Sequence, residues 1–167
     1  MDITIPRIIK NWRFSPNIEF SKNFEENKVS PGRRFARQKP NAYLWQRSFA
    51  EFGLYPNKEE PILGSLLMNH FQNKAFTHLH KDSAPEGYVH IRANVMLKKP
   101  QKGGNIIIDE KIYNVEKNDL WLILASLENH GSTPIENGER LIYSFGAILE
   151  KEKIDKILKE KENEFKS

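Results

Sequence analysis

The stretch V-H-I-R-A-N-V-M-L at residues 89–97 decides the fold class, because its apolar and polar residues alternate. Alternate residues of a strand point to opposite faces of a sheet. One predicted face is apolar and holds Val89, Ile91, Ala93, Val95 and Leu97. The other holds His90, Arg92, Asn94 and Met96. We therefore expect a strand that packs one face on a core and lines a cavity with the other.

Further short strands are expected on the C-terminal side of this stretch. A turn is predicted at residues 100–104, and strands are predicted at residues 105–109, 111–115, 120–124 and 140–149. Asn137-Gly138 is a hairpin signal between the segment that holds His130 and the last of these strands. Since no helix pattern separates the strands, they predict an antiparallel sandwich or barrel and not a parallel α/β sheet.

The N-terminal part of the chain predicts less regular structure. Ile3 and Ile5 alternate as in a strand, so a short strand is expected within residues 1–14. Residues 15–39 are rich in Asn, Ser, Pro, Gly and charge, and they predict an extended loop. The basic residues of this loop, Arg33, Arg34 and Arg37, are expected to be solvated.

Helices are expected at three places. Residues 42–52 place Trp45, Phe49 and Phe52 on one helical face, and Gly53 suits the C-terminal cap. Pro61 can open a second helix with His70 on its apolar face, although a strand is also compatible with this segment. A charged helix is predicted at residues 151–166, docked through an apolar stripe.

The composition excludes several classes of function. A chain of 167 residues predicts one domain, residues 1–167, with a single core. It has no cysteine, which excludes disulfides, thiolate nucleophiles, zinc knuckles and iron–sulfur clusters and favours a cytoplasmic location. The net charge of +4 is spread among mixed signs, so nucleic acid is an unlikely partner. No apolar run is long enough to predict a membrane span.

The candidate metal ligands are His80, Asp82 and His130. His80 and Asp82 are two residues apart, so on a strand they would face the same side, and His130 follows 48 residues later. Two histidines and one carboxylate form the facial triad of non-haem Fe(II) sites, which leaves other positions on the metal open. His78 is also two residues from His80, but the triad requires a carboxylate, so Asp82 is the preferred ligand. His70 is expected to have no ligand role.

Residues 76–148 resemble the iron(II)/2-oxoglutarate-dependent oxygenases, in the prolyl-hydroxylase-like branch of that superfamily. The resemblance rests on His80-x-Asp82, an interval of some fifty residues, and His130 followed ten residues later by Arg140. The segments K-K-P-Q-K-G-G-N-I-I-I, V-E-K-N-D-L-W-L-I-L and H-G-S-T-P-I-E-N-G-E-R resemble further parts of that pattern. Many members carry a serine two residues after the arginine, whereas this chain has Ile142 there and Ser144 four residues after it.

The resemblance implies a mainly β fold with flanking helices, namely a double-stranded β-helix or jelly-roll barrel. It also implies Fe(II) as cofactor, 2-oxoglutarate as cosubstrate, and O2. Arg140 would bind the far carboxylate of 2-oxoglutarate, with Asn94 and Ser144 as further candidate contacts. The implied reaction is hydroxylation of an unactivated C–H bond with release of succinate and CO2, and Asp82 argues against a halogenase.

The substrate is left open as a small molecule or a peptidyl residue. His78 and Arg92 are candidate substrate contacts, and residues 15–39 are a further candidate for shaping that choice. The alternative hypothesis is a cupin-type metal-binding protein or isomerase that does not use 2-oxoglutarate, because His78-x-His80 partly matches cupin motifs. Arg140 discriminates between the two hypotheses, since a cupin has no need of a residue that binds a cosubstrate carboxylate.

Overall fold

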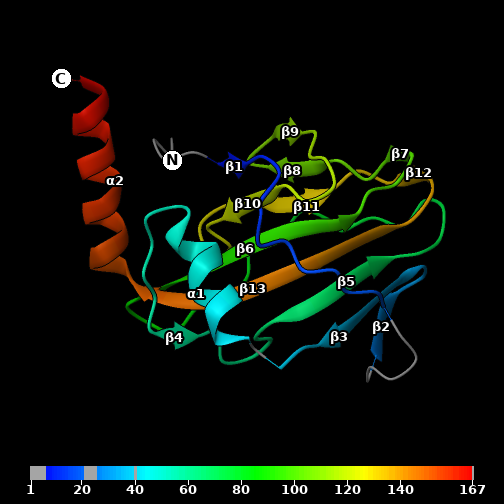
Figure 1. The fold of residues 1–167 in the computed structure, drawn as a ribbon, viewed down its shortest axis with the longest axis horizontal. Helices are drawn as coiled ribbons and strands as arrows, with labels where there is room; N and C mark the ends of the chain where they lie inside the picture. The colour runs from blue at the N-terminus through cyan, green and yellow to red at the C-terminus, as the bar shows by residue number, and fades with distance from the viewer. Residues whose placement is uncertain (1–6, 21–25, 40, 167) are drawn as a thin grey trace.

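The computed structural model describes residues 7–20, 26–39 and 41–166, and it is mainly antiparallel β-structure with two helices (Figure 1). The elements in chain order are β1 (Ile8–Ile9), β2 (Glu26–Ser30), β3 (Arg33–Arg37), α1 (Ala42–Ala50), β4 (Lys58–Glu59), β5 (Leu66–His70), β6 (Tyr88–Lys98), β7 (Lys102–Gly103), β8 (Ile106–Ile108), β9 (Lys111–Tyr113), β10 (Leu120–Ile123), β11 (His130–Ser132), β12 (Ile135–Asn137), β13 (Arg140–Glu150) and α2 (Lys151–Lys166). The predicted jelly-roll class with flanking helices is confirmed.

The long strands β6 and β13 form the centre of the main sheet. They pair antiparallel along most of their length, and the sheet continues in the order β1-β10-β6-β13-β5-β3-β2, with β4 also on β13. Two smaller antiparallel sheets, β11-β8-β9 and β12-β7, complete the fold. Nearly every residue of β6 and β13 is buried, because both faces of the central strands are covered.

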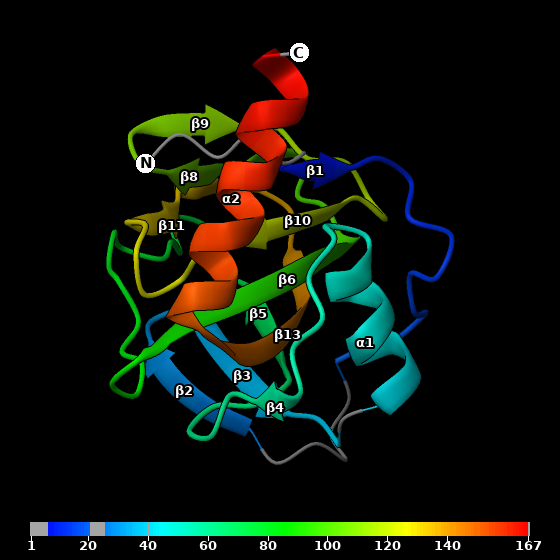
Figure 2. The same ribbon diagram turned by 90° about the vertical axis from the view of Figure 1, so that its left-hand side faces the viewer.

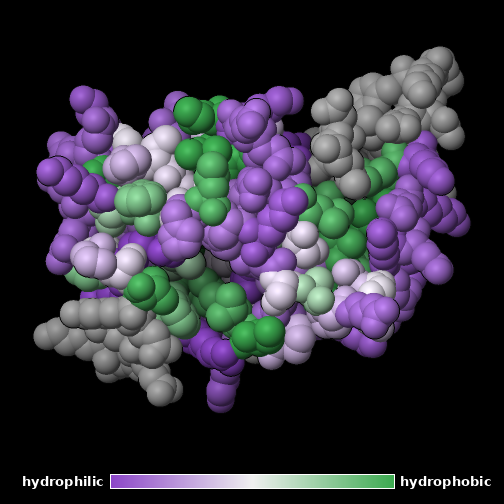
Figure 3. Space-filling model, turned by 180° about the vertical axis from the view of Figure 1, so that it is seen from behind, coloured by the Kyte–Doolittle hydropathy of each residue, from purple (hydrophilic) through white to green (hydrophobic). Residues whose placement is uncertain are grey.

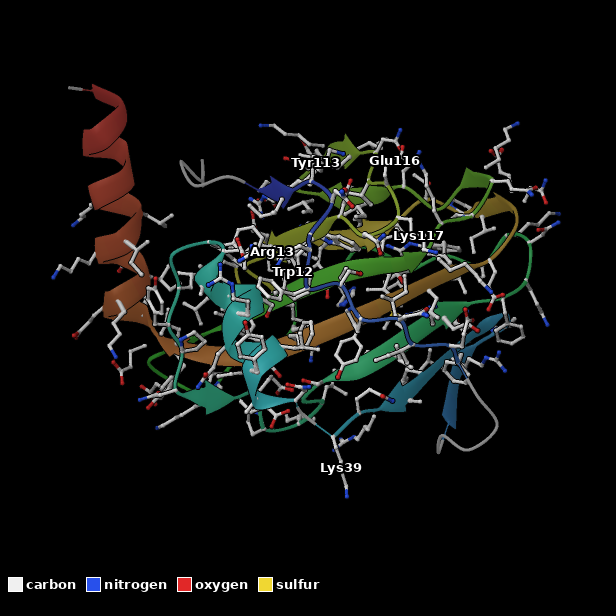
Figure 4. The ribbon with its side chains drawn as sticks, viewed as in Figure 1. Trp12, Arg13, Lys39, Tyr113, Glu116 and Lys117 are labelled. Carbon is white, nitrogen blue, oxygen red and sulfur yellow. The ribbon has the colours of Figure 1, made fainter. Side chains whose placement is uncertain are left out.

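Helix α1 and the N-terminal segment cover one face of the main sheet. Figure 2 shows α1 on one side of β6 and β13 and the small strands β8, β9 and β11 on the other. The core under α1 contains Trp45 and Phe49, and the Trp45 indole N–H donates to the Gly146 carbonyl of β13 at 2.9 Å. Trp12, labelled in Figure 4, enters the same core and meets Phe145 edge to face. These aromatic contacts confirm the predicted face of α1.

The second core lies between the main sheet and the small strands. It is built by apolar residues of both layers: Met96, Ile106, Ile108, Val115, Trp121, Ile123, Ala125 and Ile142. The polar residues Arg92 and Asn94 share the Met96 face of β6 and line a pocket on this side, as the alternation predicted. This core therefore forms the floor of a cavity between the layers.

Two predictions about the chain path are wrong, and one alternative that the sequence left open is decided. Within residues 15–39, the segment from Glu26 to Arg37 forms the hairpin β2–β3, not an extended loop; it pairs with β5 and extends the main sheet. Of the helix and the strand considered after Pro61, the strand is observed: residues 66–70 are β5, because they pair with β3 and β13 on both sides. Asn137-Gly138 makes a turn with a positive φ at Gly138, but β12 pairs with β7 and β13 with β5 and β6, so the turn does not close a hairpin.

The ends of the chain agree with the predictions where they are described. Ile3 and Ile5 lie outside the described residues, while Ile8 and Ile9 form β1 on the edge of β10. Helix α2 spans the predicted residues and docks through Ile154, which is 2% exposed. Helix α1 begins after Asn41, whose side chain caps the Leu44 N–H, and ends earlier than expected, before Gly53. Neither described helix is long and apolar enough to cross a membrane.

Candidate metal centre and its pocket

His80, Asp82 and His130 meet at one end of the pocket between the two layers. His130 begins β11, whereas His80 and Asp82 lie on an extended segment that is outside the regular sheets, contrary to the expected strand. Backbone hydrogen bonds still fix this segment: His80 and His130 exchange both N–H···O bonds, and the Asp82 N–H donates to the Ala125 carbonyl. The pairing brings ligands from distant parts of the sequence side by side.

The three side chains present their ligand atoms within 4.8 Å of one another. His80 Nε2 lies 3.1 Å from Asp82 Oδ1, and His130 Nε2 lies 3.6 Å from Asp82 Oδ2. The imidazole rings are 4.4 Å apart between centroids. Among the residues that the structure describes, this is the group whose His and carboxylate atoms converge closely enough to hold a metal ion.

The outer nitrogen of each histidine is already fixed. His80 Nδ1–H donates to the His78 carbonyl at 2.8 Å, and His130 Nδ1–H donates to the Glu128 carbonyl at 2.9 Å. Because a carbonyl only accepts, each neutral ring has its lone pair on Nε2, toward Asp82. Such bonds orient histidines in metal sites and raise their basicity. Three acceptor atoms thus face one another, an arrangement that a shared cation stabilises.

The protonation equilibria reflect the same convergence. Burial opposes the ionised form of Asp82, but hydrogen bonds from His130 and His80 outweigh it and hold the pKa of this carboxyl well below its usual range. The hydrogen bond to Asp82 raises the pKa of His80. Without a metal, a proton on His80 therefore provides the missing positive charge. A divalent cation would replace that proton.

Two arginine side chains, Arg92 and Arg140, line the pocket with the candidate metal ligands. The cavity holds about 120 Å³, and its walls include Met68, Trp121 and Ile142 beside Arg140. Arg140 is 4% exposed and forms no ion pair within the described part of the chain. Its Nε has no hydrogen-bond partner, and its Nη1 lies 3.4 Å from His70 Nδ1. Burial, followed by the charge of Arg33, lowers the pKa of Arg140 to about 9. The guanidinium is thus a buried charge without a counter-ion.

His70 is fully buried and acts as a neutral spacer in this region. Its Nε2 and the Thr77 hydroxyl are 3.0 Å apart. Burial, and then the charges of Arg140 and Arg33, lower the pKa of His70 to about 2, so the ring stays uncharged near neutral pH. His70 lies outside the triad, and its lack of a ligand role stays a prediction.

Arg92 contrasts with Arg140, because it has anionic neighbours. Its guanidinium donates to the Gly64 carbonyl at 3.1 Å and the Ser144 hydroxyl at 2.9 Å. It also lies 3.6 Å from Glu60 Oε2 and 3.9 Å from Asp82 Oδ2. Glu60 in turn accepts backbone N–H bonds from residues 62–64, which holds this loop against the pocket. Arg92 therefore links the loop to a metal ligand.

The remaining predicted site residues are placed as follows. Asn94 and Ser144 line the pocket, with Asn94 Oδ1 unpartnered and the Ser144 hydroxyl accepting from Arg92. His78 is exposed and outside the triad, although its ring lies 5.7 Å from that of His80. The sequence analysis missed Glu60 and Arg33. The prediction that Arg33 is solvated is wrong, since it is 8% exposed.

Comparisons with known proteins identify the fold. No protein-family model and no curated protein matches the sequence. An oxidoreductase of the 2OG-Fe(II) oxygenase family from Burkholderia pseudomallei matches with a TM-score of 0.56 and 15% identity, over 75% of this chain and 72% of that one. KdgF from Halomonas sp. also matches, with a TM-score of 0.49 and 12% identity over 80% of this chain and 94% of that one. An RmlC-like cupin from Shewanella frigidimarina matches with a TM-score of 0.49 and 14% identity over 80% of this chain and 92% of that one. At these identities the likeness shows the fold alone, a double-stranded β-helix.

Proposed function

We propose that this chain is an Fe(II)- and 2-oxoglutarate-dependent oxygenase that hydroxylates an unactivated C–H bond. The observation that carries the proposal is Arg140, a buried cation without a counter-ion in the same pocket as a His-Asp-His triad. Arginine presents a fork of N–H donors that matches a carboxylate. A carboxylate bound there would supply the missing negative charge.

Each residue then has a defined task. His80, Asp82 and His130 would hold Fe(II) through atoms that already converge, with the tautomers fixed by the carbonyls behind the rings. Arg140 would bind the distal carboxylate of 2-oxoglutarate and orient the cosubstrate toward the triad. The bound iron supplies the oxidation in which O2, 2-oxoglutarate and the substrate R–H give R–OH, succinate and CO2.

The pocket walls favour such a reaction. Met68, Trp121 and Ile142 are apolar and line the same pocket as Arg140 and the triad. Apolar walls exclude water, which strengthens the pairing of Arg140 with a carboxylate and protects reactive species. Asn94 Oδ1, unpartnered in the wall, offers a further polar contact. The substrate class expected here is a small molecule or a peptidyl side chain.

The test is an anaerobic titration of 2-oxoglutarate into the Fe(II)-loaded protein, monitored by the metal-to-ligand charge-transfer band. The wild type should show a saturable band. Arg140→Ala should bind Fe(II) normally and need at least roughly thirty-fold more 2-oxoglutarate, since truncating one member of a buried charge pair costs about 2 to 5 kcal/mol. Arg140→Lys should rescue only partly, because lysine lacks the fork.

Two outcomes would contradict the proposal to different degrees. If the wild type binds Fe(II) but never shows the band, the oxygenase hypothesis fails and a metal-binding cupin without 2-oxoglutarate replaces it. If wild type and Arg140→Ala saturate alike, the cosubstrate carboxylate is held by another residue.

A further inference from the structure

A row of three basic residues crosses the pocket face of the main sheet. The register places Arg33 of β3 opposite His70 of β5, and His70 opposite Arg140 of β13. Directly opposed residues project from the same face of a sheet. On that face the next inward residue of β5 is Met68, which lines the pocket with Arg140. The hairpin β2–β3 thus adds a third arginine, after Arg92 and Arg140, to the pocket side of the sheet.

The contacts of Arg33 show that its charge is not compensated. Its side chain is nearly enclosed, and its Nη2 lies 3.8 Å from Met68 Sδ, so the guanidinium leans toward the pocket wall. Its Nε is buried without a partner, and no described residue forms an ion pair with it. Burial lowers its pKa. A buried, unpaired guanidinium is costly for a fold to keep, which suggests a ligand.

The charge of Arg33 acts on Arg140. The two arginines flank His70 in the register of the sheet, and after burial the charge of Arg33 is the second cause that lowers the pKa of Arg140. The Gly32 carbonyl, beside Arg33, accepts from the Phe71 N–H, which holds the β2–β3 turn at the end of β5. Arg33 therefore stands within electrostatic reach of Arg140.

The distal carboxylate of 2-oxoglutarate does not account for both cations. One carboxylate takes two parallel donors from one guanidinium, and Arg140 offers its free Nε for that pairing. When this carboxylate is bound, the charge of Arg33 is still unmatched. Arg33 does not line the pocket itself but lies behind Met68, which does. An anion that passes the Met68 side chain and reaches Arg33 would therefore lie beside the cosubstrate.

We propose that Arg33 is a specificity-determining residue that binds an anionic group, a carboxylate or a phosphate, on the primary substrate. This inference rests on the proposed function, since it assigns Arg140 to the cosubstrate. It places the recognition element on the β2–β3 hairpin, within the part of the chain where the sequence resembles no known family. The substrate class is accordingly an organic acid or a phosphate ester.

The experiment is a calorimetric titration of two probes, inorganic phosphate and acetate, into protein saturated with Mn(II) and 2-oxoglutarate. Mn(II) is used because it occupies the metal site without turnover. Arg33→Gln is compared with Arg34→Gln, the neighbour on the opposite face of β3, whose guanidinium stacks on Phe71. Both substitutions remove one positive charge from the same strand, so the loss of charge and any weakening of the hairpin are matched between the two variants. The stronger probe distinguishes a phosphate ester from a carboxylic acid.

We expect saturable binding of at least one probe by the wild type, weakened ten-fold or more in Arg33→Gln and unchanged in Arg34→Gln. The affinity for 2-oxoglutarate should stay within about two-fold in both variants. Absence of saturable binding by the wild type, or equal binding by Arg33→Gln, would overturn the inference. So would a loss of 2-oxoglutarate affinity in Arg33→Gln as large as in Arg140→Ala, because Arg33 would then belong to the cosubstrate site.

A failure of the proposed function gives a different pattern. If the wild type does not bind 2-oxoglutarate, the same titrations are made on metal-free protein. Dependence of phosphate or acetate binding on Arg33 there still supports an anion site at this residue, and its absence rejects one.

Discussion

Replacing Arg140 by methionine should stabilise the metal-free protein while abolishing its response to 2-oxoglutarate. Arg140 is charged, buried and without a counter-ion in the described structure. Methionine has a similar length and no charge, so it fills much of the same space beside Met68 and Ile142. Replacing a buried ion by an apolar side chain of similar volume is often stabilising. Here no counter-ion among the described residues loses its partner, and only the long contact of 3.4 Å from Arg140 Nη1 to His70 Nδ1 is removed.

The size of the effect follows from the pKa of Arg140. Burial and the charge of Arg33 lower this pKa from the ordinary arginine value to about 9. At about 1.36 kcal/mol for each tenfold change in proton affinity, the charge opposes folding by at most about 5 kcal/mol. Water in the pocket and relaxation around the charge reduce this penalty, so we expect a gain of about 1 to 3 kcal/mol in the free energy of unfolding. This corresponds to about 1 M in the urea midpoint for a slope near 2 kcal/mol/M.

The pH dependence provides an internal check on the cause. The folded protein holds the Arg140 proton less tightly than the unfolded chain, so the penalty is complete below the folded pKa of about 9 and fades as the pH rises from there toward the higher pKa of the unfolded chain. The stability advantage of Arg140→Met should therefore narrow between about pH 8 and about pH 10. Urea unfolding followed by circular dichroism in EDTA measures both quantities.

Arg92→Met is the matched control, because Arg92 is equally buried but has Glu60 and Asp82 as neighbours. Removing it leaves the buried Glu60 carboxylate without its cation, so this variant should lose about 3 kcal/mol. Opposite signs for the two substitutions would show that the counter-ion, not burial alone, decides the effect. The reasoning is refuted if Arg140→Met is destabilised by more than about 1 kcal/mol, or if its advantage does not change with pH.

Four further substitutions test the metal centre and its support. Asp82→Asn should lower Mn(II) affinity at least ten-fold by calorimetry, whereas His78→Ala should keep it; the reverse result would make His78 the ligand. Gly131→Ala should also weaken Mn(II) binding, because the added Cβ would lie 2.5 Å from the Thr77 carbonyl oxygen and would push the segment before His80 away from β11. An unchanged Mn(II) affinity would show that this segment adapts without moving His80. Glu60→Gln should lower the free energy of unfolding by about 1 to 3 kcal/mol. The amide accepts hydrogen bonds from the N–H groups of residues 62–64 less well than the carboxylate, and it removes the anionic partner of Arg92. An unchanged urea midpoint would contradict that role of Glu60.

The sequence predicted the parts of the fold that depend on local periodicity. The alternation at residues 89–97 predicted β6 and its two faces, and the aromatic spacing around Trp45 predicted α1. The pairing of strands was not predictable in the same way. Residues 66–70 have an apolar spacing that suits a helix, and they become β5 because β3 and β13 offer hydrogen-bond partners on both edges. Propensity is a weak guide where tertiary pairing decides the outcome.

The candidate ligands were predictable because residue type and spacing carry metal chemistry. The bridge between His80 and His130 was not, since it depends on a contact between segments 50 residues apart. The burial of Arg33 was also not predictable from the sequence. Its neighbours in the sequence are polar and flexible in composition, which predicted a solvated loop, whereas its burial arises from pairing with β5. The burial of a charged residue in an edge hairpin depends on the surface the hairpin meets, and no local pattern encodes that surface.

The pocket combines a group of acceptor atoms with unpaired cationic donors, and this combination restricts the ligands that fit. Three acceptor atoms of His80, Asp82 and His130 converge and require a cation. Arg140 lines the same pocket and Arg33 lies behind its wall residue Met68, and the Nε of each arginine is buried without a partner among the described residues. A metal ion alone satisfies the acceptor atoms and leaves the donors unpaired, as would be the case in a metal-binding cupin. A carboxylate that reaches from the metal to Arg140 satisfies both, and it leaves Arg33 to select a substrate that carries an anion of its own.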